Sequence, residues 1–370
     1  MSGPRPVLLL AHSLDLGGTE RQMTEVAKGL DRQRFEPHIA TFHPQGIRAD
    51  ELRAHGVPVL HLPVTSFVSA SALQGGLALI RYIRQHRIRL VHSFDVPLNI
   101  FAVPFARLAH DPVVLSSQRA HRSLTPGIYT RLLRITDQMV DGIVVNCEHM
   151  REHLMNDERV PSSLIHLCYN GIDLAVFHRE RKPALPPEHT VVIGVVCALR
   201  PEKGLTNLLE AFARLHRNHA NARLLIVGSG PMLSELEALA EALNVRAWCR
   251  FEPKTADVAP WMRAMDIFVL PSLSEALSNS LMEAMACGCC CVASRVGGNP
   301  ELLGNDESRG LLFAKGDSAD LAKALERLMG GAAARAHFSQ AGHRFIHESF
   351  SQSRSVKRME KIYEEFLDAN

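Results

Sequence analysis

Residues 266–288 read Asp266-Ile267-Phe268-Val269-Leu270-Pro271-Ser272-Leu273-Ser274-Glu275-Ala276-Leu277-Ser278-Asn279-Ser280-Leu281-Met282-Glu283-Ala284-Met285-Ala286-Cys287-Gly288. The apolar run after Asp266 predicts a buried strand, the polar residues after it predict a loop, and the remainder predicts a helix. Ser278 or Asn279 can cap that helix. The free N–H groups of its first turn, from Ser278 through Asn279, Ser280 and Leu281, then form an expected cradle for a phosphate.

Two glutamates stand on either side of this expected cradle. Glu275 lies in the loop and Glu283 lies early in the helix. Carboxylates accept strongly from hydroxyl groups, so the pair suits a hydroxyl-rich ligand such as a sugar and a ribose. The alternative is that Glu275 is a surface residue and that Glu283 only stabilises the helix dipole.

The same alternation of short apolar runs with helical patterns extends through the whole chain and predicts βαβ units with parallel sheets. Proline-rich residues 182–187 separate two such halves, which places the boundary near residue 185 and the domains at 1–185 and 186–350. Residues 351–370 carry an apolar stripe that predicts a final helix. The expected strands are Val7–Ala11, His38–Thr41, Val59–Leu62, Leu90–Ser93, Val113–Ser116, Ile143–Asn146, Ile165–Tyr169, Val191–Cys197, Leu224–Val227, Ile267–Leu270, Cys289–Ser294 and Gly310–Phe313.

Length and composition exclude several classes of protein. A chain of 370 residues with 46% apolar content suits two buried cores and excludes a disordered chain. The net charge of +2 argues against a nucleic-acid partner. Eight cysteines without zinc spacing, and no signal-peptide or membrane-spanning run, favour a cytoplasmic protein. The run Cys287–Cys291 is expected in a buried strand, where neighbouring side chains point to opposite faces and cannot converge on one metal ion.

Cations follow the expected strand Val191–Cys197. Arg200 and Lys203 lie just beyond its carboxyl end. An arginine fork with a lysine point charge suits a phosphate or a diphosphate, although a solvated helix start would look the same.

Glycines follow two other strands. Gly17 and Gly18 come after Val7–Ala11, where Thr19 is expected to cap a helix, and Gly228 comes after Leu224–Val227. Glycines at such positions let the backbone approach a ligand, and they also make tight turns without one.

These features together resemble the motifs of the retaining GT-B glycosyltransferases of glycosyltransferase family 4. The residues that carry the resemblance are Gly17-Gly18, Asn170-Gly171-Ile172-Asp173 with Phe177, Arg200 to Gly204, Gly228-Ser229-Gly230-Pro231, Glu275 to Glu283, and Gly297-Gly298-Asn299-Pro300-Glu301. The resemblance implies an α/β fold of GT-B architecture, in which two Rossmann-like doubly wound domains face a central cleft. Residues 1–185 would bind the acceptor, residues 186–350 would bind a sugar nucleotide, and the helix in 351–370 would cross back to the N-terminal domain.

The resemblance also implies roles for individual residues. Arg200 and Lys203 would hold the donor diphosphate, Glu275 would contact hydroxyls of the donor sugar, and Glu283 would bind the ribose. Gly18 would approach the donor phosphates or the acceptor through the backbone, and Gly17, Gly228 and Ser278 to Leu281 would lie at the donor. The family places a histidine after the strand matched by Val113–Ser116, and this chain departs from that pattern with Gln118-Arg119-Ala120-His121-Arg122. We assign that role to His121, with Arg119 as the alternative, and place Arg119 and Arg122 on the acceptor side.

The implied reaction is transfer of a sugar, with retained configuration, from a nucleotide diphosphate sugar to a glycan or lipid-linked acceptor in surface polysaccharide or glycolipid synthesis. The donor expected is a UDP-sugar, the commonest in the family. Fixed positive charge beside the leaving diphosphate supplies the main catalytic need. Neither a cofactor nor a metal ion is expected, and the chain contains no Asp-x-Asp sequence.

A basic segment bears on the acceptor. Between Arg81 and Arg134 the chain has arginines at 81, 84, 87, 89, 107, 119, 122, 131 and 134 against Asp95 and Asp111. It favours an anionic acceptor or peripheral contact with an acidic inner membrane leaflet, unless these are solvated helix faces balanced elsewhere. The alternative functions are a non-catalytic partner subunit of the same fold, and a sugar phosphorylase or sugar-nucleotide epimerase.

Overall fold

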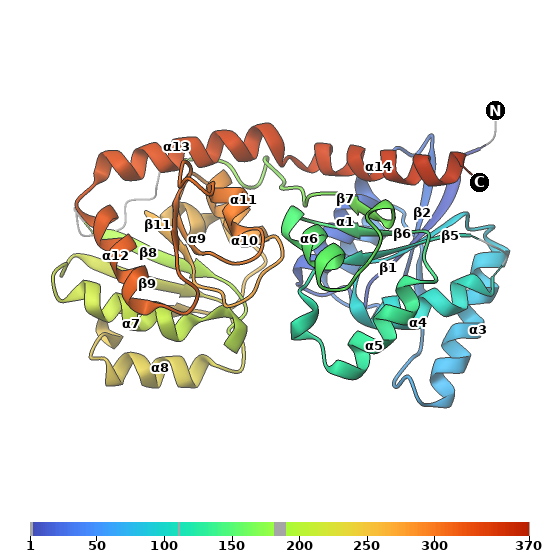
Figure 1. Ribbon diagram of the computed structural model, residues 1–370, viewed down its shortest axis with the longest axis horizontal. Helices are drawn as coiled ribbons and strands as arrows, with labels where there is room; N and C mark the ends of the chain where they lie inside the picture. The colour runs from blue at the N-terminus through green and yellow to red at the C-terminus, as the bar shows by residue number, and fades with distance from the viewer. Residues whose placement is uncertain (1–2, 110–111, 181–189, 370) are drawn as a thin grey trace. The chain divides into compact units, whose positions relative to one another are not determined.

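The computed structural model describes residues 3–109, 112–180 and 190–369 (Figure 1). They form two compact units, each built on a parallel sheet with helices on both faces. This confirms the predicted α/β class and its two doubly wound domains. Every predicted strand is present, with ends that differ by at most three residues.

The first unit contains a seven-stranded sheet in the order β3-β2-β1-β4-β5-β6-β7. The order reverses between β1 and β4, because the chain leaves β1 toward β2 and β3 and returns to the other side of β1. The strands are β1 (Arg5–Leu10), β2 (Phe35–Thr41), β3 (Val59–His61), β4 (Leu90–Ser93), β5 (Val113–Gln118), β6 (Gly142–Val145) and β7 (Ile165–Leu167). Its helices are α1 (Gly18–Gly29), α2 (Ile47–Ala54), α3 (Ala70–Gln85), α4 (Val96–Arg107), η1 (Arg122–Leu124), α5 (Gly127–Asp137), α6 (Glu148–Asn156), η2 (Ser162–Leu164) and α14 (Gln352–Asp368).

The second unit contains a six-stranded sheet in the order β10-β9-β8-β11-β12-β13, and its order reverses between β8 and β11. The strands are β8 (Val191–Val196), β9 (Ala222–Val227), β10 (Cys249–Glu252), β11 (Ile267–Leu270), β12 (Cys290–Ser294) and β13 (Leu311–Phe313). The helices are η3 (Pro201–Lys203), α7 (Leu205–His216), α8 (Leu233–Ala242), η4 (Arg246–Trp248), α9 (Ala259–Ala264), α10 (Asn279–Ala286), α11 (Asn299–Leu303), α12 (Ser318–Met329) and α13 (Ala332–Ser349).

The edge strand β10 is the one strand that the sequence analysis did not predict. Its residues Cys249-Arg250-Phe251-Glu252 alternate charged with apolar side chains over only four positions, and it pairs with β9 alone. The cysteine run lies only partly in the expected strand: Cys290 and Cys291 open β12, whereas Cys287 is the C-cap of α10 and Cys289 lies just before the strand; all four are buried.

The division between the units differs from the predicted one. The predicted boundary at 185 lies outside the described residues, whereas the contacts divide the chain after Gly171. Ile172 donates its backbone N–H to Phe350 O at 2.8 Å, Phe177 is buried, and Val176 O accepts from Arg263. Residues 172–180 therefore belong to the second unit, because their hydrogen bonds and their apolar side chain are satisfied there.

The helix α14 belongs to the first unit, which confirms the predicted return of the chain. Met359, Ile362 and Tyr363 join the core beneath α1 and the sheet. The Tyr363 hydroxyl lies 2.8 Å from His92 Nδ1, and the Glu360 carboxylate accepts from the Asp31 backbone N–H at 2.7 Å. None of the described helices combines the length and the apolar character that crossing a bilayer requires.

Candidate functional site

The carboxyl ends of β8 and β11 bring charged residues together in the second unit. These neighbouring strands flank the point where the strand order reverses, which is where open α/β sheets bind ligands. Lys203 follows β8 and Glu275 follows β11, and Lys203 Nζ donates to Glu275 Oε1 at 2.6 Å. The Ser272 hydroxyl donates to the same oxygen at 2.7 Å. Two residues that the sequence predicted as ligand-binding groups thus meet at one point, and Ser272 is a partner that it did not predict.

The cations of this cluster differ in their surroundings. Burial acts to lower the pKa of Lys203, but the Glu275 carboxylate beside it more than offsets this effect, so the pKa is raised and the ammonium stays charged. Arg200 is exposed, and the described residues include no ion-pair partner for its guanidinium. The cluster therefore holds one cation fixed by an internal carboxylate and one that is open to an external anion.

Backbone packing holds the two loops of the cluster against each other. Gly204 has φ +63°, and a Cβ at this position would lie 2.2 Å from Pro271 O. Leu273 donates its backbone N–H to Glu202 O at 2.7 Å. The left-handed conformation and the lack of space both require glycine here, so the turn after β8 is held directly against the loop after β11.

Helix α10 begins as predicted at the edge of this cluster. Ser278 is its N-cap, and the Ser278 hydroxyl accepts from Leu281 N at 3.3 Å. The first turn contains no acidic residue, and Glu283 is only 3% exposed. Helix-dipole stabilisation by Glu283, the alternative considered above, therefore does not account for this residue.

The glycines after β9 have a structural reason of their own. Gly228 has φ +153°, and a Cβ there would lie 1.9 Å from Cys197 O; a Cβ on Gly230 would lie 2.3 Å from Leu199 O. The backbone after β9 thus runs directly against the turn after β8. This packing explains both glycines without a ligand, so their presence alone is no evidence for donor binding.

In the first unit, the corresponding reversal lies between β1 and β4. Asp95 caps α4 and accepts backbone N–H groups from Leu98 at 3.0 Å and from His12 at 2.5 Å. Burial raises the pKa of Asp95 to about 7, against the lowering effect of these two hydrogen bonds. Asp95 and His12 are titratable groups that the sequence analysis missed as site residues. Their positions directly after two neighbouring strands were the available signal.

The turn after β1 differs in detail from the prediction. Helix α1 begins at Gly18 with Gly17 as its N-cap and without a side-chain cap, so the expected capping by Thr19 is wrong. A Cβ on Gly17 would lie 1.9 Å from Glu20 Oε2, and the Glu20 carboxylate accepts from the Ser13 hydroxyl at 3.1 Å. A carboxylate from α1 itself therefore lies beside the N-terminus of this helix.

The three candidate residues in the segment after β5 have different surroundings. Arg119 lies over the Phe94 ring at 5.3 Å and donates to Asn170 Oδ1 at 3.1 Å, and burial lowers its pKa to about 10. Arg122 has a side chain only 1% exposed and forms ion pairs with Asp137 and Glu158. The acceptor-side role predicted for Arg122 is therefore corrected: its guanidinium is buried and occupied inside the first unit. His121 lies against the His153 ring, with centroids 3.8 Å apart.

The basic segment is partly balanced by acidic residues from later in the chain. Arg107 pairs with Asp141 at 2.8 Å, and Arg122 and Arg134 both pair with Glu158. Five exposed arginines have no carboxylate partner in the part of the chain that the structure describes: Arg81, Arg84, Arg87, Arg89 and Arg131. The basic character predicted for this segment thus rests on these five residues rather than on nine.

An apolar cavity of about 780 Å³ lies beside the carboxyl edge of the first sheet. Phe42, Phe67 and Tyr129 line it together with His12 and His43. Phe42 packs edge-on against Phe101, with ring centroids 5.2 Å apart, which holds one wall in place. The cavity combines a hydrophobic wall with two imidazoles.

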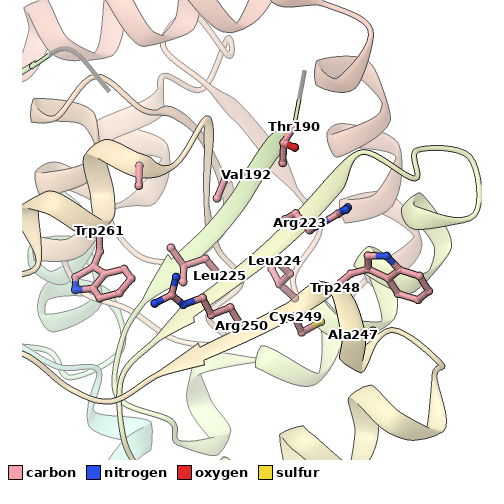
Figure 2. A pocket seen from close by; sticks show the side chains of 11 residues that line it. Thr190, Val192, Arg223, Leu224, Leu225, Ala247, Trp248, Cys249, Arg250 and Trp261 are labelled. Atoms are coloured by element: carbon pink, nitrogen blue, oxygen red, sulfur yellow. The ribbon is translucent and has the colours of Figure 1, made fainter. Parts of the chain in front are cut away.

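A smaller hollow of about 270 Å³ lies at the opposite, amino edge of the second sheet (Figure 2). Figure 2 shows Trp261 beside Arg250, whose guanidinium lies 5.2 Å from the indole centroid, and Trp248 on the other side of the strands. The chain has only these two tryptophans. This hollow is separate from the Lys203–Glu275 cluster, and tryptophan fluorescence reports on the second unit alone.

Comparison with known proteins matches each half of the chain to a glycosyltransferase family model. Residues 16–176 match the model of Glycosyltransferase Family 4, and residues 176–345 match that of Glycosyl transferases group 1. D-inositol 3-phosphate glycosyltransferase of Saccharomonospora viridis is 30% identical over 288 residues, which are 73% of this chain and 66% of that protein. N-acetyl-alpha-D-glucosaminyl L-malate synthase of Bacillus anthracis is 27% identical over 212 residues, 56% of this chain and 55% of that protein. The chain thus spans little more than half the length of the second relative.

The fold matches that of solved structures over nearly its whole length. HepE of Anabaena, crystallised with UDP, superposes with a TM-score of 0.83 at 17% identity and covers 98% of this chain and all of that one. Sucrose-phosphate synthase of Thermosynechococcus elongatus superposes with a TM-score of 0.85 at 18% identity, covering 99% of this chain and all of that one. With both halves matched by family models and two Rossmann-like domains of GT-B type, the chain belongs to glycosyltransferase family 4.

Proposed function

We propose that this glycosyltransferase moves a sugar, with retention of configuration, from a nucleotide diphosphate sugar to a glycan or lipid-linked acceptor. The observation that carries the proposal is the Lys203–Glu275–Ser272 cluster at the strand-order reversal of the second unit, with the exposed Arg200 beside it. The crystal structures of HepE with UDP support a UDP-sugar as donor. We further propose a role in surface polysaccharide or glycolipid synthesis, on the inner face of the membrane.

Each group of the cluster has a task in this reaction. Loss of the diphosphate leaves a sugar with oxocarbenium character, so fixed positive charge is needed where negative charge grows. Arg200 and Lys203 supply it, and the N–H groups at the start of α10 add to it. Glu275 accepts from hydroxyls of the donor sugar, and Glu283 accepts from the ribose. The leaving phosphate oxygen takes the proton of the acceptor group that attacks the sugar. The proposed reaction therefore needs no nucleophile from these residues.

Titration calorimetry of the metal-free protein with UDP, GDP and ADP tests the donor site. We expect binding of UDP, and we expect about tenfold or greater weakening in Arg200→Ala and Lys203→Ala, because each variant loses a charged hydrogen bond to the diphosphate. Arg327→Ala is the matched control, since it removes an exposed arginine of the same unit that pairs only with Glu307 among the described residues. If the protein binds GDP or ADP more tightly than UDP, the proposed donor base becomes guanine or adenine instead of uracil.

A folded protein that binds none of the three diphosphates would instead support a non-catalytic partner subunit. The departure from the family pattern around His121 favours that alternative. Release of a sugar phosphate, without transfer of the sugar to an acceptor, would support a phosphorylase.

The apolar cavity of the first unit supports an acceptor with a hydrophobic part. Its wall of Phe42, Phe67 and Tyr129 suits a lipid chain or another apolar group, and the neighbouring Ile128 is 61% exposed. The five exposed arginines without a carboxylate partner among the described residues suit an anionic group such as a phosphate. A lipid-linked phosphate carries both features.

Helix α3 supports contact with a membrane surface. One face packs into the unit through Leu79 and Ile83, and the opposite face exposes Leu73 and Leu77 and then Arg81. Exposed leucines followed by a cation suit the boundary between acyl chains and anionic headgroups.

We expect the protein to sediment with vesicles that contain anionic lipid, and we expect the double change Leu73→Ser and Leu77→Ser to reduce the bound fraction severalfold. Leu233→Ser, which changes a partly exposed leucine of α8, is the control. Equal sedimentation of the double variant and the wild type would remove α3 from the proposed contact.

A further inference from the structure

Three potential metal ligands converge in the first unit, outside the donor cluster. They are His121, just before η1, and His153 and Asp157, at the end of α6. One ligand atom of each lies within 4.8 Å of the others. His149 precedes His153 by one helical turn, and its ring lies 6.3 Å from that of His121. Residues far apart in the chain thus place three imidazoles and a carboxylate in one small region.

The hydrogen bonds of His153 favour a ligand rather than a purely structural ring. His153 Nδ1 lies 2.6 Å from Asp157 Oδ2. His153 Nε2 is buried and has no hydrogen-bond partner among the described residues. Nε2 points away from Asp157 and takes no part in the cluster, whereas Nδ1 and Oδ2 are two potential ligand atoms close enough to hold one ion in place of the proton between them.

The charges around the cluster allow a cation to approach. Asp157 is exposed, with 65% of its side chain accessible, which leaves an entry path from solvent. The nearby Arg122 pairs with Asp137 and Glu158, and Arg134 also pairs with Glu158, so two carboxylates balance the two positive charges.

We propose that His121, His153 and Asp157 form a site for a divalent transition-metal ion such as Zn²⁺, with solvent or His149 completing the shell. Imidazole with carboxylate is the donor set that Zn²⁺, Co²⁺ and Ni²⁺ prefer, and it disfavours Mg²⁺ and Ca²⁺. The ion takes the place of the proton shared by His153 Nδ1 and Asp157 Oδ2, which is released to solvent. It joins the segment after β5 to the end of α6 and thereby stabilises the folded first unit, by an amount that grows with the logarithm of the free ion concentration above the Kd.

The test is calorimetric titration of the tag-free, EDTA-treated full-length protein with ZnCl₂, with Co²⁺ absorption as a second readout. We expect one strong binding step per chain, at least about tenfold weaker in His153→Ala and in Asp157→Ala. Asp157 is exposed at the end of its helix, so the second variant preserves the fold even if the first does not. Four-coordinate Co²⁺ would give intense visible absorption that both variants lose.

The control is His347→Ala. His343 and His347 stack on α13 with ring centroids 4.1 Å apart, and the described residues offer this pair of imidazoles no third ligand. The strong step should persist in that variant. The proposal is overturned if the wild type shows no strong step. It is also overturned if His153→Ala and Asp157→Ala both bind with the affinity of the wild type, or if the step is lost only in His347→Ala.

Discussion

Replacing Glu275 by alanine is expected to lower sugar transfer by about a hundred- to a thousandfold while the protein stays folded. The Glu275 carboxylate accepts from Lys203 and Ser272 at 2.6 and 2.7 Å, so one side chain sets the positions of both partners. The variant loses the proposed contacts to the sugar hydroxyls, and it leaves Lys203 without the carboxylate that raises its pKa. Initial rates with a UDP-sugar and a lipid-linked acceptor measure the effect.

Two further variants separate the parts of this effect. Glu275→Gln keeps an oxygen that accepts from the Ser272 hydroxyl but removes the negative charge, so an activity between those of the wild type and Glu275→Ala is expected. Glu237→Ala is the matched control, because Glu237 pairs with Arg246 at 3.1 Å in the same unit but away from the cluster. Glu275→Ala with nearly normal transfer would remove this residue from the proposed mechanism.

Replacing Arg122 by alanine is expected to destabilise the first unit by about 3 to 5 kcal/mol. The Arg122 side chain is 1% exposed, and it donates to Asp137 at 2.6 Å and to Glu158 at 3.3 Å. Both carboxylates are themselves largely buried, and truncation would leave Asp137 without this counter-charge. Urea denaturation followed by far-UV circular dichroism measures the loss. Tryptophan fluorescence should show an unchanged transition for the second unit if the units unfold independently, because both tryptophans lie there.

The pH dependence gives this variant a signature of its own. Burial already raises the pKa of Asp137, and Arg122 opposes that increase. Without Arg122 the folded-state pKa rises further, so the folded variant holds a proton that the unfolded chain releases as the pH increases. The stability deficit of the variant should therefore grow from pH 5 to pH 8. A variant with unchanged stability but weaker acceptor binding would restore the acceptor-side role first predicted for Arg122.

Local patterns in the sequence predicted the secondary structure and the edge of the sheet at which the candidate site residues lie. Alternating apolar runs and helical periodicities predicted each strand except β10, which is too short and too charged to show a buried pattern. The same patterns placed Arg200, Lys203 and Glu275 directly after strands. Parallel strands carry their loops to a common edge, so position after a strand was sufficient to predict that these side chains lie at one edge of the sheet.

Only the tertiary structure decided which of these side chains meet. Lys203 and Glu275 are 72 residues apart, and they come together because β8 and β11 are neighbours although β9 and β10 lie between them in sequence. Arg122 looked like a free cation until Asp137 and Glu158, from later elements, were found against it. Likewise, the units divide after Gly171 because Ile172 bonds to Phe350, far along the chain. Periodicity is a local property, whereas the partners of a buried charge depend on strand order, which links segments that no local pattern connects.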